Sequence, residues 1–257
     1  MLFDSHSHLN YEDYTDEARA AVMERVEASP VSYVVDVGFN VESSRQAIKD
    51  AAEREWCYAA VGVHPHDVKD MKDEDAQTLL ELAKTPKVVA FGEIGLDFYR
   101  DYSPRDVQRA VFRKQLNLAF ETGLPIIIHD RESAGETINI LIEEKAFSKA
   151  RILLHCFSGS AEQAIEYIGL GCAISVAGPV TYRNNKKTVR VAAEIPLEHL
   201  LIETDTPFLT PEPFRGQRNE PANVEYVARK IAELRGITYE EVAAATLENA
   251  KRFYGIE

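Results

Sequence analysis

The sequence predicts a (β/α)8 TIM barrel, an α/β fold in which eight parallel strands alternate with helices. Eight short runs of Val, Ile, Leu and Ala recur along the 257 residues without clean polar alternation, which is typical of strands covered on both faces. Segments with helical periodicity separate these runs. The alternative is a doubly wound sheet, but no Gly-rich phosphate-binding fingerprint follows the first run.

The predicted strands and helices follow one another along the whole chain. The strands are residues 2–6, 33–38, 58–63, 88–93, 125–129, 152–156, 173–177 and 200–203. Residues 104–122 carry apolar side chains at helical spacing, and Pro104 suits the first turn of that helix. Residues 221–235 repeat the pattern, and an extra C-terminal helix is expected after them. Because no Gly/Ser-rich or Pro-rich linker interrupts this order, residues 1–257 are predicted to form one domain.

The composition is acidic, because 29 Lys and Arg residues against 42 Asp and Glu residues give a formal net charge of −13. Proteins that bind nucleic acid with a broad surface are usually basic. A ligand that bears phosphate is therefore expected to be held locally, by a few basic side chains or by bound cations.

The sequence also indicates where the protein works. No apolar run approaches the ~20 residues of a spanning helix, so no membrane partner is expected. The N-terminal residues lack the basic and apolar regions of a signal peptide. Three widely spaced cysteines without a CxxC motif favour a reducing compartment, so we expect a cytoplasmic protein. Nothing in the sequence indicates an obligate protein partner.

Polar side chains stand at the carboxyl ends of the predicted strands, where barrel enzymes have their active sites. They are His6, His8, Glu93, His129, His155 and Asp205. His6 and His8 are two residues apart on extended backbone, so both imidazoles project from one face and can meet one cation. Glu93 and Asp205 follow apolar runs, and burying a carboxylate is costly unless it is paired or binds a metal.

Taken one at a time, each of these residues is more often structural, whereas the set together favours metal binding. Nitrogen and carboxylate ligands suit Zn²⁺ or Mn²⁺, and Mg²⁺ if waters complete its shell. Six ligands exceed one tetrahedral site. The sequence therefore predicts two divalent cations, with Glu93 as the carboxylate that bridges them.

Seven segments, in order along essentially the whole chain, carry a family resemblance. They are FDSHSH, GVHPH, GEIGLD, IIIHDR, LLHCFSG, IETDTPFL and RGQRNEP. The chain resembles the TatD-type metal-dependent deoxyribonucleases, within the amidohydrolase-like barrels. The resemblance implies that one ion is held by His6, His8, Glu93 and Asp205. It implies that Glu93, His129 and His155 hold the second. Many amidohydrolase-like relatives bridge their ions with a carbamylated lysine, and the presence of Glu93 instead fits the TatD-type branch.

Two cations ~3.5–4 Å apart lower the pKa of a shared water and clamp an in-line displacement at phosphorus. Our mechanistic hypothesis is that a metal-bridging hydroxide attacks the phosphodiester. Asp205 orients this hydroxide and is the candidate general base. His64, at the end of the third predicted strand, is the candidate contact to substrate phosphate or leaving group. A hydrogen bond from His64 to a metal ligand is an equally good interpretation.

Further residues are expected around this centre. Ser158, Arg215 and Arg218 lie in loops that follow strands, and we predict that they bind substrate phosphate, although ordinary polar loops fit the pattern too. His66 is expected to be exposed to solvent. Asp97 is expected to orient metal ligands by hydrogen bonding. Three more side chains are a solvated loop or a nucleotide contact: Tyr99, Arg100 and Tyr102.

The sequence therefore predicts a two-metal hydrolase that cleaves phosphodiester bonds of DNA. An exonuclease on single-stranded ends is favoured, because an open barrel mouth accepts a chain terminus more readily than the interior of a duplex. The alternative is a hydrolase of another ester or amide, such as an aminoacyl-tRNA or a small cyclic amide, on the same metals. A binding barrel without catalysis is the third interpretation, and it predicts an incomplete ligand set.

Overall fold

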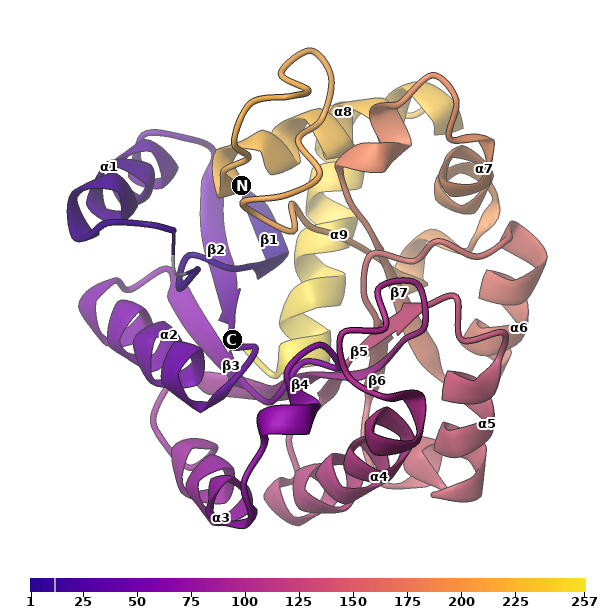
Figure 1. Cartoon of the computed structure of the whole chain (residues 1–257). Coiled ribbons are helices and arrows are strands. Elements are labelled where there is room, and N and C mark those ends of the chain that lie inside the picture. The colour runs from indigo at the N-terminus through magenta and orange to yellow at the C-terminus, as the bar shows by residue number, and fades with distance from the viewer. Residues whose placement is uncertain (12) are drawn as a thin grey trace.

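A computed structural model of the chain describes residues 1–11 and 13–257. In this part of the chain eight strands form one parallel sheet, and each strand pairs with the next in chain order (Figure 1). They are β1 (Leu2–Ser7), β2 (Val31–Val37), β3 (Cys57–Val61), β4 (Val88–Asp97), β5 (Ile126–Arg131), β6 (Ile152–Leu154), β7 (Cys172–Val176) and β8 (Leu200–Ile202). The strand order is that of a barrel, as the sequence predicts.

The segment that follows β8 joins the last strand to the first. The backbone N–H of Asp205 donates to the carbonyl of His6 at 2.9 Å, and the N–H of His8 donates to the carbonyl of Thr206 at 2.7 Å. The Ser5 hydroxyl donates to the carbonyl of Ile202 at 2.9 Å. These bonds bring the two edges of the sheet together, so the barrel is nearly closed.

Helices surround the strands (Figure 1). Those in the described residues are α1 (Asp16–Glu27), α2 (Val41–Glu53), α3 (Asp73–Leu82), α4 (Arg105–Thr122), α5 (Glu136–Glu143), α6 (Ala161–Leu170), α7 (Lys186–Glu194), α8 (Val224–Arg235) and α9 (Tyr239–Tyr254). Both helices predicted in detail are present, although Pro104 is the N-cap of α4 rather than part of its first turn. None of these helices is long and apolar enough to cross a membrane.

Alternate side chains of each strand point to two different layers of the core. Phe3, Ile127 and Leu201 belong to the layer inside the barrel, whereas their neighbours along the strands pack under the helices. Helix α9, yellow in Figure 1, is the predicted extra helix, and it adds Phe253 and Tyr254 to the inner layer. The Tyr254 hydroxyl donates to the carbonyl of Ser5 at 2.7 Å. Side chains of α9 therefore complete the inner layer of the core.

Several predicted strand ends are wrong by a few residues, and β4 differs most. It continues four residues beyond the predicted end, from Glu93 to Asp97. Gly92 and Gly95 have φ angles of 146° and 149°, which side chains disfavour. A Cβ atom on Gly95 would lie 1.9 Å from the carbonyl oxygen of His129. Glycine at this position lets β4 run close beside β5, which brings Glu93 and His129 together.

Candidate metal centre

The six side chains predicted as ligands meet at the carboxyl end of the barrel. Glu93 is in β4 and His129 is in β5, whereas His155 directly follows β6. His6 is in β1, and Asp205 lies three residues beyond the end of β8. Most of them are buried: the exposed fraction is 0% for His6 and 3% for Glu93, and the Asp205 side chain is 16% exposed.

The two carboxylate oxygens of Glu93 face different imidazoles. Its Oε1 lies 3.2 Å from Nε2 of His8 and 3.7 Å from Nε2 of His6. Its Oε2 lies 2.8 Å from Nε2 of His155 and 3.3 Å from Nδ1 of His129. The Oδ1 atom of Asp205 joins the first group, at 3.6 Å from Nε2 of His8. Glu93 therefore lies between two separate sets of donor atoms.

Hydrogen bonds at the outer nitrogens identify which inner nitrogens have a free lone pair. The Nδ1 of His8 lies 2.7 Å from the carbonyl oxygen of Val37, which can only accept, so in the neutral ring the proton is on Nδ1 and Nε2 offers the lone pair. The Nε2 of His129 lies 3.2 Å from a carboxylate oxygen of Asp97, which leaves Nδ1 free. In both residues the free nitrogen faces Glu93, as metal ligation requires.

His64 has the opposite arrangement. Its Nδ1 accepts a hydrogen bond from the backbone N–H of His66 at 3.1 Å, so the proton of the neutral ring is on Nε2. That Nε2 lies 3.2 Å from Nδ1 of His129 and 3.9 Å from Oε2 of Glu93. His64 therefore stands beside the candidate ligands as a hydrogen-bond donor.

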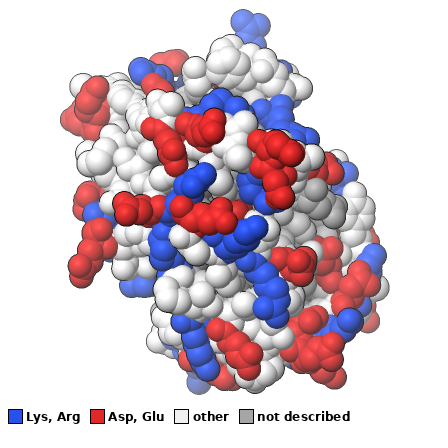
Figure 2. Space-filling model, turned by 90° about the vertical axis from the view of Figure 1, so that its left-hand side faces the viewer, with Lys and Arg blue, Asp and Glu red and all other residues white. Residues whose placement is uncertain are grey.

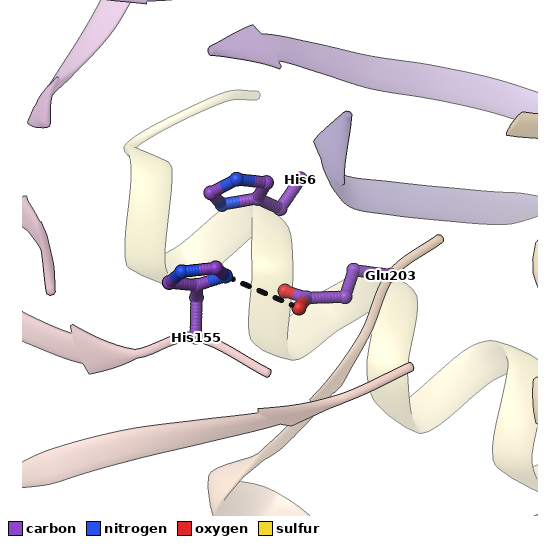
Figure 3. Close-up of side chains that lie close together, drawn as sticks. All are labelled: His6, His155 and Glu203. Atoms are coloured by element: carbon purple, nitrogen blue, oxygen red, sulfur yellow. Dashed lines mark ion pairs between the residues drawn. The ribbon is translucent and has the colours of Figure 1, made fainter. Parts of the chain in front are cut away.

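A deeper group of three residues lies beneath this centre: His6, His155 and Glu203 (Figure 3). The two imidazole rings stack at 4.0 Å with an interplanar angle of 9°. Oε1 of Glu203 lies 3.4 Å from Nδ1 of His155, and Oε2 accepts a hydrogen bond from the Ser175 hydroxyl at 2.6 Å. When the His155 ring is neutral, this carboxylate favours a proton on Nδ1, which leaves Nε2 as the ligand atom toward Glu93.

Glu203 is absent from the predicted site, because in the sequence it is the last residue of a predicted apolar strand, 200–203. The same sequence feature that predicts Glu93 as a ligand is present at Glu203, because both carboxylates follow a run of apolar residues. Within residues 1–11 and 13–257, Nδ1 of His6 is buried without a hydrogen-bond partner, whereas Nδ1 of His155 and Oε1 of Glu203 have their mutual ion pair but no hydrogen bond. Unsatisfied polar atoms of this kind are rare in folded proteins and fit a site that binds an ion.

The electrostatics of the centre keep both predicted acidic ligands ionised. Burial alone would raise the pKa of Glu93, but the surrounding imidazoles outweigh it and hold this pKa well below its ordinary value. Burial also acts to raise the pKa of Asp205, and the hydrogen bond and charge of His8 lower it overall. Burial lowers the pKa of His64 well below its ordinary value, so its ring is neutral at pH 7.

The prediction that His66 is exposed is wrong. Its side chain is 27% exposed, and Nε2 lies 2.8 Å from a carboxylate oxygen of Asp97. Asp97 also accepts hydrogen bonds from the backbone N–H groups of Tyr99 and Arg100, at 3.0 and 2.8 Å. Fixed in this way, the carboxylate orients the rings of His66 and His129. This geometry agrees with the orienting role that the sequence predicts for Asp97.

A cavity of about 720 Å³ opens over the candidate ligands. His64 and Ser158 lie on its wall, as a role in substrate binding requires. Arg215 and Arg218 are not among its lining residues. The guanidinium of Arg215 lies 4.2 Å over the ring of Tyr182, and that of Arg218 lines a different, smaller pocket. The structure therefore brings the predicted ligands together but does not bring these two arginines to them.

The donor set fits divalent cations. It combines imidazole nitrogens with free lone pairs, two ionised carboxylates, and a glutamate with one oxygen toward each nitrogen set. Three atoms drawn from His6, His8 and Glu93 lie within 4.8 Å of one another, and so do three from His64, Glu93 and His129. A (β/α)8 barrel with this centre at its carboxyl end defines the class of metal-dependent hydrolases.

Comparisons with known proteins identify the family within this class. A family model described as TatD related DNase matches residues 3–255. The chain is 50% identical to the "uncharacterized metal-dependent hydrolase YabD" of Bacillus subtilis, over 100% of both chains. It is 35% identical to the "3'-5' ssDNA/RNA exonuclease TatD" of Erwinia amylovora, over 93% of this chain and 94% of that protein. The chain belongs to the TatD-related DNase family.

A solved structure supports the same assignment. The crystal structure of YjjV, a TatD homologue from Escherichia coli, matches with a TM-score of 0.92 and 30% identity. The match covers 100% of this chain and 98% of that one. This protein is a metal-dependent hydrolase with the TatD barrel.

Proposed function

We propose that the chain is an exonuclease that hydrolyses phosphodiester bonds at the ends of single-stranded DNA, using two divalent cations. The observation that carries this proposal is the division of the Glu93 carboxylate between two sets of donors. His6, His8 and Asp205 would hold one cation with Oε1. His129 and His155 would hold the other with Oε2. Bound cations would acidify water and neutralise the charge that develops on the phosphoryl oxygens.

Asp205 is suited to accept a proton from the attacking water. Its side chain lines the cavity and is ionised, since its pKa is lowered. Its backbone is held on both sides, because its N–H donates to His6 at 2.9 Å and its carbonyl accepts from the N–H of Phe208 at 2.8 Å. A carboxylate fixed in this way can act as a general base without reorganisation.

His64 is suited to bind the phosphoryl group. Its neutral ring carries the proton on Nε2, which points toward the donors around Glu93, and the ring lines the cavity. An N–H donor at this position stabilises negative charge on a phosphoryl oxygen. We assign His64 to substrate binding rather than to metal ligation.

The choice of single-stranded DNA rests on the relatives and on charge. Relatives at about one-third identity bear names that specify 3′–5′ ssDNA/RNA exonuclease activity. The chain has a net charge of −13, and basic and acidic side chains are interspersed on the face in Figure 2. So acidic a chain is unsuited to holding a duplex by a broad surface, which usually requires basic side chains. A local centre that holds one strand end avoids this requirement.

The test uses chelator-stripped protein to which Mg²⁺, Mn²⁺ or Zn²⁺ is restored, incubated with end-labelled single-stranded DNA. The Glu93→Ala variant, purified in the same way, controls for contaminating nucleases. The proposal predicts metal-dependent stepwise shortening by the wild type alone. Equal activity of the two proteins, or no shortening with any of the ions, would overturn the assignment to DNA.

A further inference from the structure

One side of the cavity mouth is aromatic. Tyr11, Phe39 and Phe208 line the cavity where β1, β2 and β8 end, and we call them the aromatic wall. Tyr11 meets Phe208 edge to face at 5.2 Å between ring centroids and lies 6.0 Å from Phe39. Phe39 in turn lies 5.9 Å from the ring of His8. The wall is therefore continuous from the rim of the mouth to a candidate metal ligand.

Phe208 is the exposed end of this wall. Its side chain is 44% exposed, although exposing a phenyl ring to water is unfavourable. Its backbone is held at both ends: its N–H donates to Asp205 at 2.8 Å, and its carbonyl accepts from Nδ2 of Asn219 at 2.7 Å. The same Nδ2 atom bonds the carbonyl of Thr204 at 2.9 Å. The loop thus fixes an apolar ring in water, three residues after the candidate general base.

Two arginines stand on the opposite side of the mouth, beside Asp97 and Asp130. Arg100 follows β4 and Arg131 ends β5, and both line the cavity; we call them the cationic wall. β4 and β5 are four places from β8 and β1 in the sheet order, so the cationic wall lies across the barrel from Phe208 and Tyr11. The guanidinium groups of Arg100 and Arg131 lie 5.5 Å and 4.1 Å from the ring centroid of Tyr99, and no ion pair with a carboxylate is found for either among residues 1–11 and 13–257. In a chain with a net charge of −13, this leaves two arginines for an anionic ligand.

We propose that the mouth is a binding site for an unpaired nucleotide strand. One base stacks on Phe208 of the aromatic wall, and the phosphates beyond the scissile bond lie on Arg100 and Arg131. Aromatic side chains stack on any base because every base has a π-face, and basic grooves follow the backbone. The inference rests on the proposed function, and it adds a physical reason for selecting single strands. A base in a duplex is already stacked on its neighbours and is not available to the ring of Phe208.

Binding is measured by fluorescence anisotropy with a labelled phosphorothioate oligothymidylate, which resists hydrolysis, in the presence of Mg²⁺. An abasic strand of the same length is the second ligand. Phe208→Ala is expected to weaken binding of the oligothymidylate about tenfold and to change binding of the abasic strand less than about twofold. Phe208→Tyr restores the affinity. Ile165→Ala removes a side chain of similar exposure outside the cavity, and it is expected to leave both affinities unchanged.

Variants of the cationic wall are expected to change binding in a different way from Phe208→Ala. The double variant Arg100→Ala/Arg131→Ala is expected to weaken binding of the oligothymidylate and of the abasic strand equally. It lowers the slope of log Kd against log salt by about 1.4, since each phosphate contact on a single strand contributes about 0.7. Equal losses for the two strands with Phe208→Ala, no loss, or no binding by the wild type would overturn the proposal. Cleavage of unmodified DNA without any Phe208 effect would contradict this inference alone. The predicted binding pattern without cleavage would contradict the proposed function alone.

Discussion

Glu93 and Asp36 are two buried carboxylates in neighbouring parts of one barrel, and their charge states differ. Glu93 is 3% exposed and Asp36 is 0% exposed, so both lose nearly all their hydration. Imidazoles surround Glu93 and hold its pKa well below the ordinary value against the effect of burial. Burial raises the pKa of Asp36 well above its ordinary value, and the charge of Asp50 raises it further. The surroundings therefore decide what each carboxylate can do.

Asp36, whose pKa burial and the neighbouring Asp50 raise, has a structural role. Oδ1 of Asp36 accepts hydrogen bonds from the backbone N–H of Leu9 at 2.8 Å and from Nδ2 of Asn10 at 2.7 Å. These bonds fix the chain directly after His8. Glu93 instead remains an anion whose oxygens face imidazole nitrogens, and bound cations would balance its charge. The comparison teaches that burial alone does not mark a metal ligand, whereas burial among imidazoles does.

Removing the charge of Glu93 has the largest predicted effect. Glu93→Gln keeps the size of the side chain but cannot bridge two cations. We expect hydrolysis to fall by more than about a hundredfold, beyond the effect of losing an outer hydrogen-bond partner. Steady-state kinetics on end-labelled single-stranded DNA measure the loss, and circular dichroism checks the fold. A loss of less than tenfold would contradict the bridging role.

A smaller effect is predicted for Glu203, which orients His155 from below. Glu203→Gln is expected to weaken metal affinity by about 10- to 100-fold, because the ring loses its fixed tautomer. Isothermal titration with Mn²⁺ measures the affinity. Ser175→Ala, which removes the hydrogen bond to the other oxygen of Glu203, is expected to give a weaker change in the same direction. Lower thermal stability with unchanged metal affinity would show that Glu203 is only a packing residue.

The carboxylate pair predicts how stability depends on pH. The raised pKa values of Asp36 and Asp50 mean that the folded chain binds protons more tightly than the unfolded chain. Their contribution is complete below the ordinary carboxyl pKa of about 3.9 and is lost as pH rises through the raised values. Asp50→Asn supplies an amide donor to Asp36, and we expect it to raise the free energy of unfolding by about 1 kcal/mol at pH 8.

Urea unfolding of Asp50→Asn and the wild type between pH 5 and pH 8 measures this difference, which is expected to shrink as pH falls. Asp70→Asn, at an exposed position, is the control. A destabilised Asp50→Asn variant at pH 8, or a difference that does not vary with pH, would contradict the raised pKa values of this pair.

The smallest effects are predicted for Arg215 and Arg218. Both lie outside the lining of the main cavity. Arg215→Ala and Arg218→Ala are each expected to lower kcat/KM on single-stranded DNA by no more than about fivefold, since exposed charges contribute about 1 kcal/mol or less. A larger loss of kcat/KM than that caused by Arg100→Ala would show that these arginines do contact the substrate.

The candidate ligands could be predicted because each one follows an apolar run, and parallel strands end at one edge of the barrel. The partners of Glu203 could not, since they depend on the register of β7 with β8. Ser175 pairs with Leu201, and Glu203 is two residues further on the same side. The path of the loop that carries Arg215 and Arg218 could not be predicted either. Asn219 bonds back to Phe208, a contact with no periodic signal in the sequence.

The most direct test of the central claim counts the ions and asks whether they share a ligand. Chelator-stripped protein is titrated with Mn²⁺ and followed by electron paramagnetic resonance. The account predicts two ions per chain, with a spin-coupled spectrum when both are bound and an uncoupled one in Glu93→Gln. A single ion per chain, or two ions without coupling in the wild type, would contradict a centre bridged by Glu93.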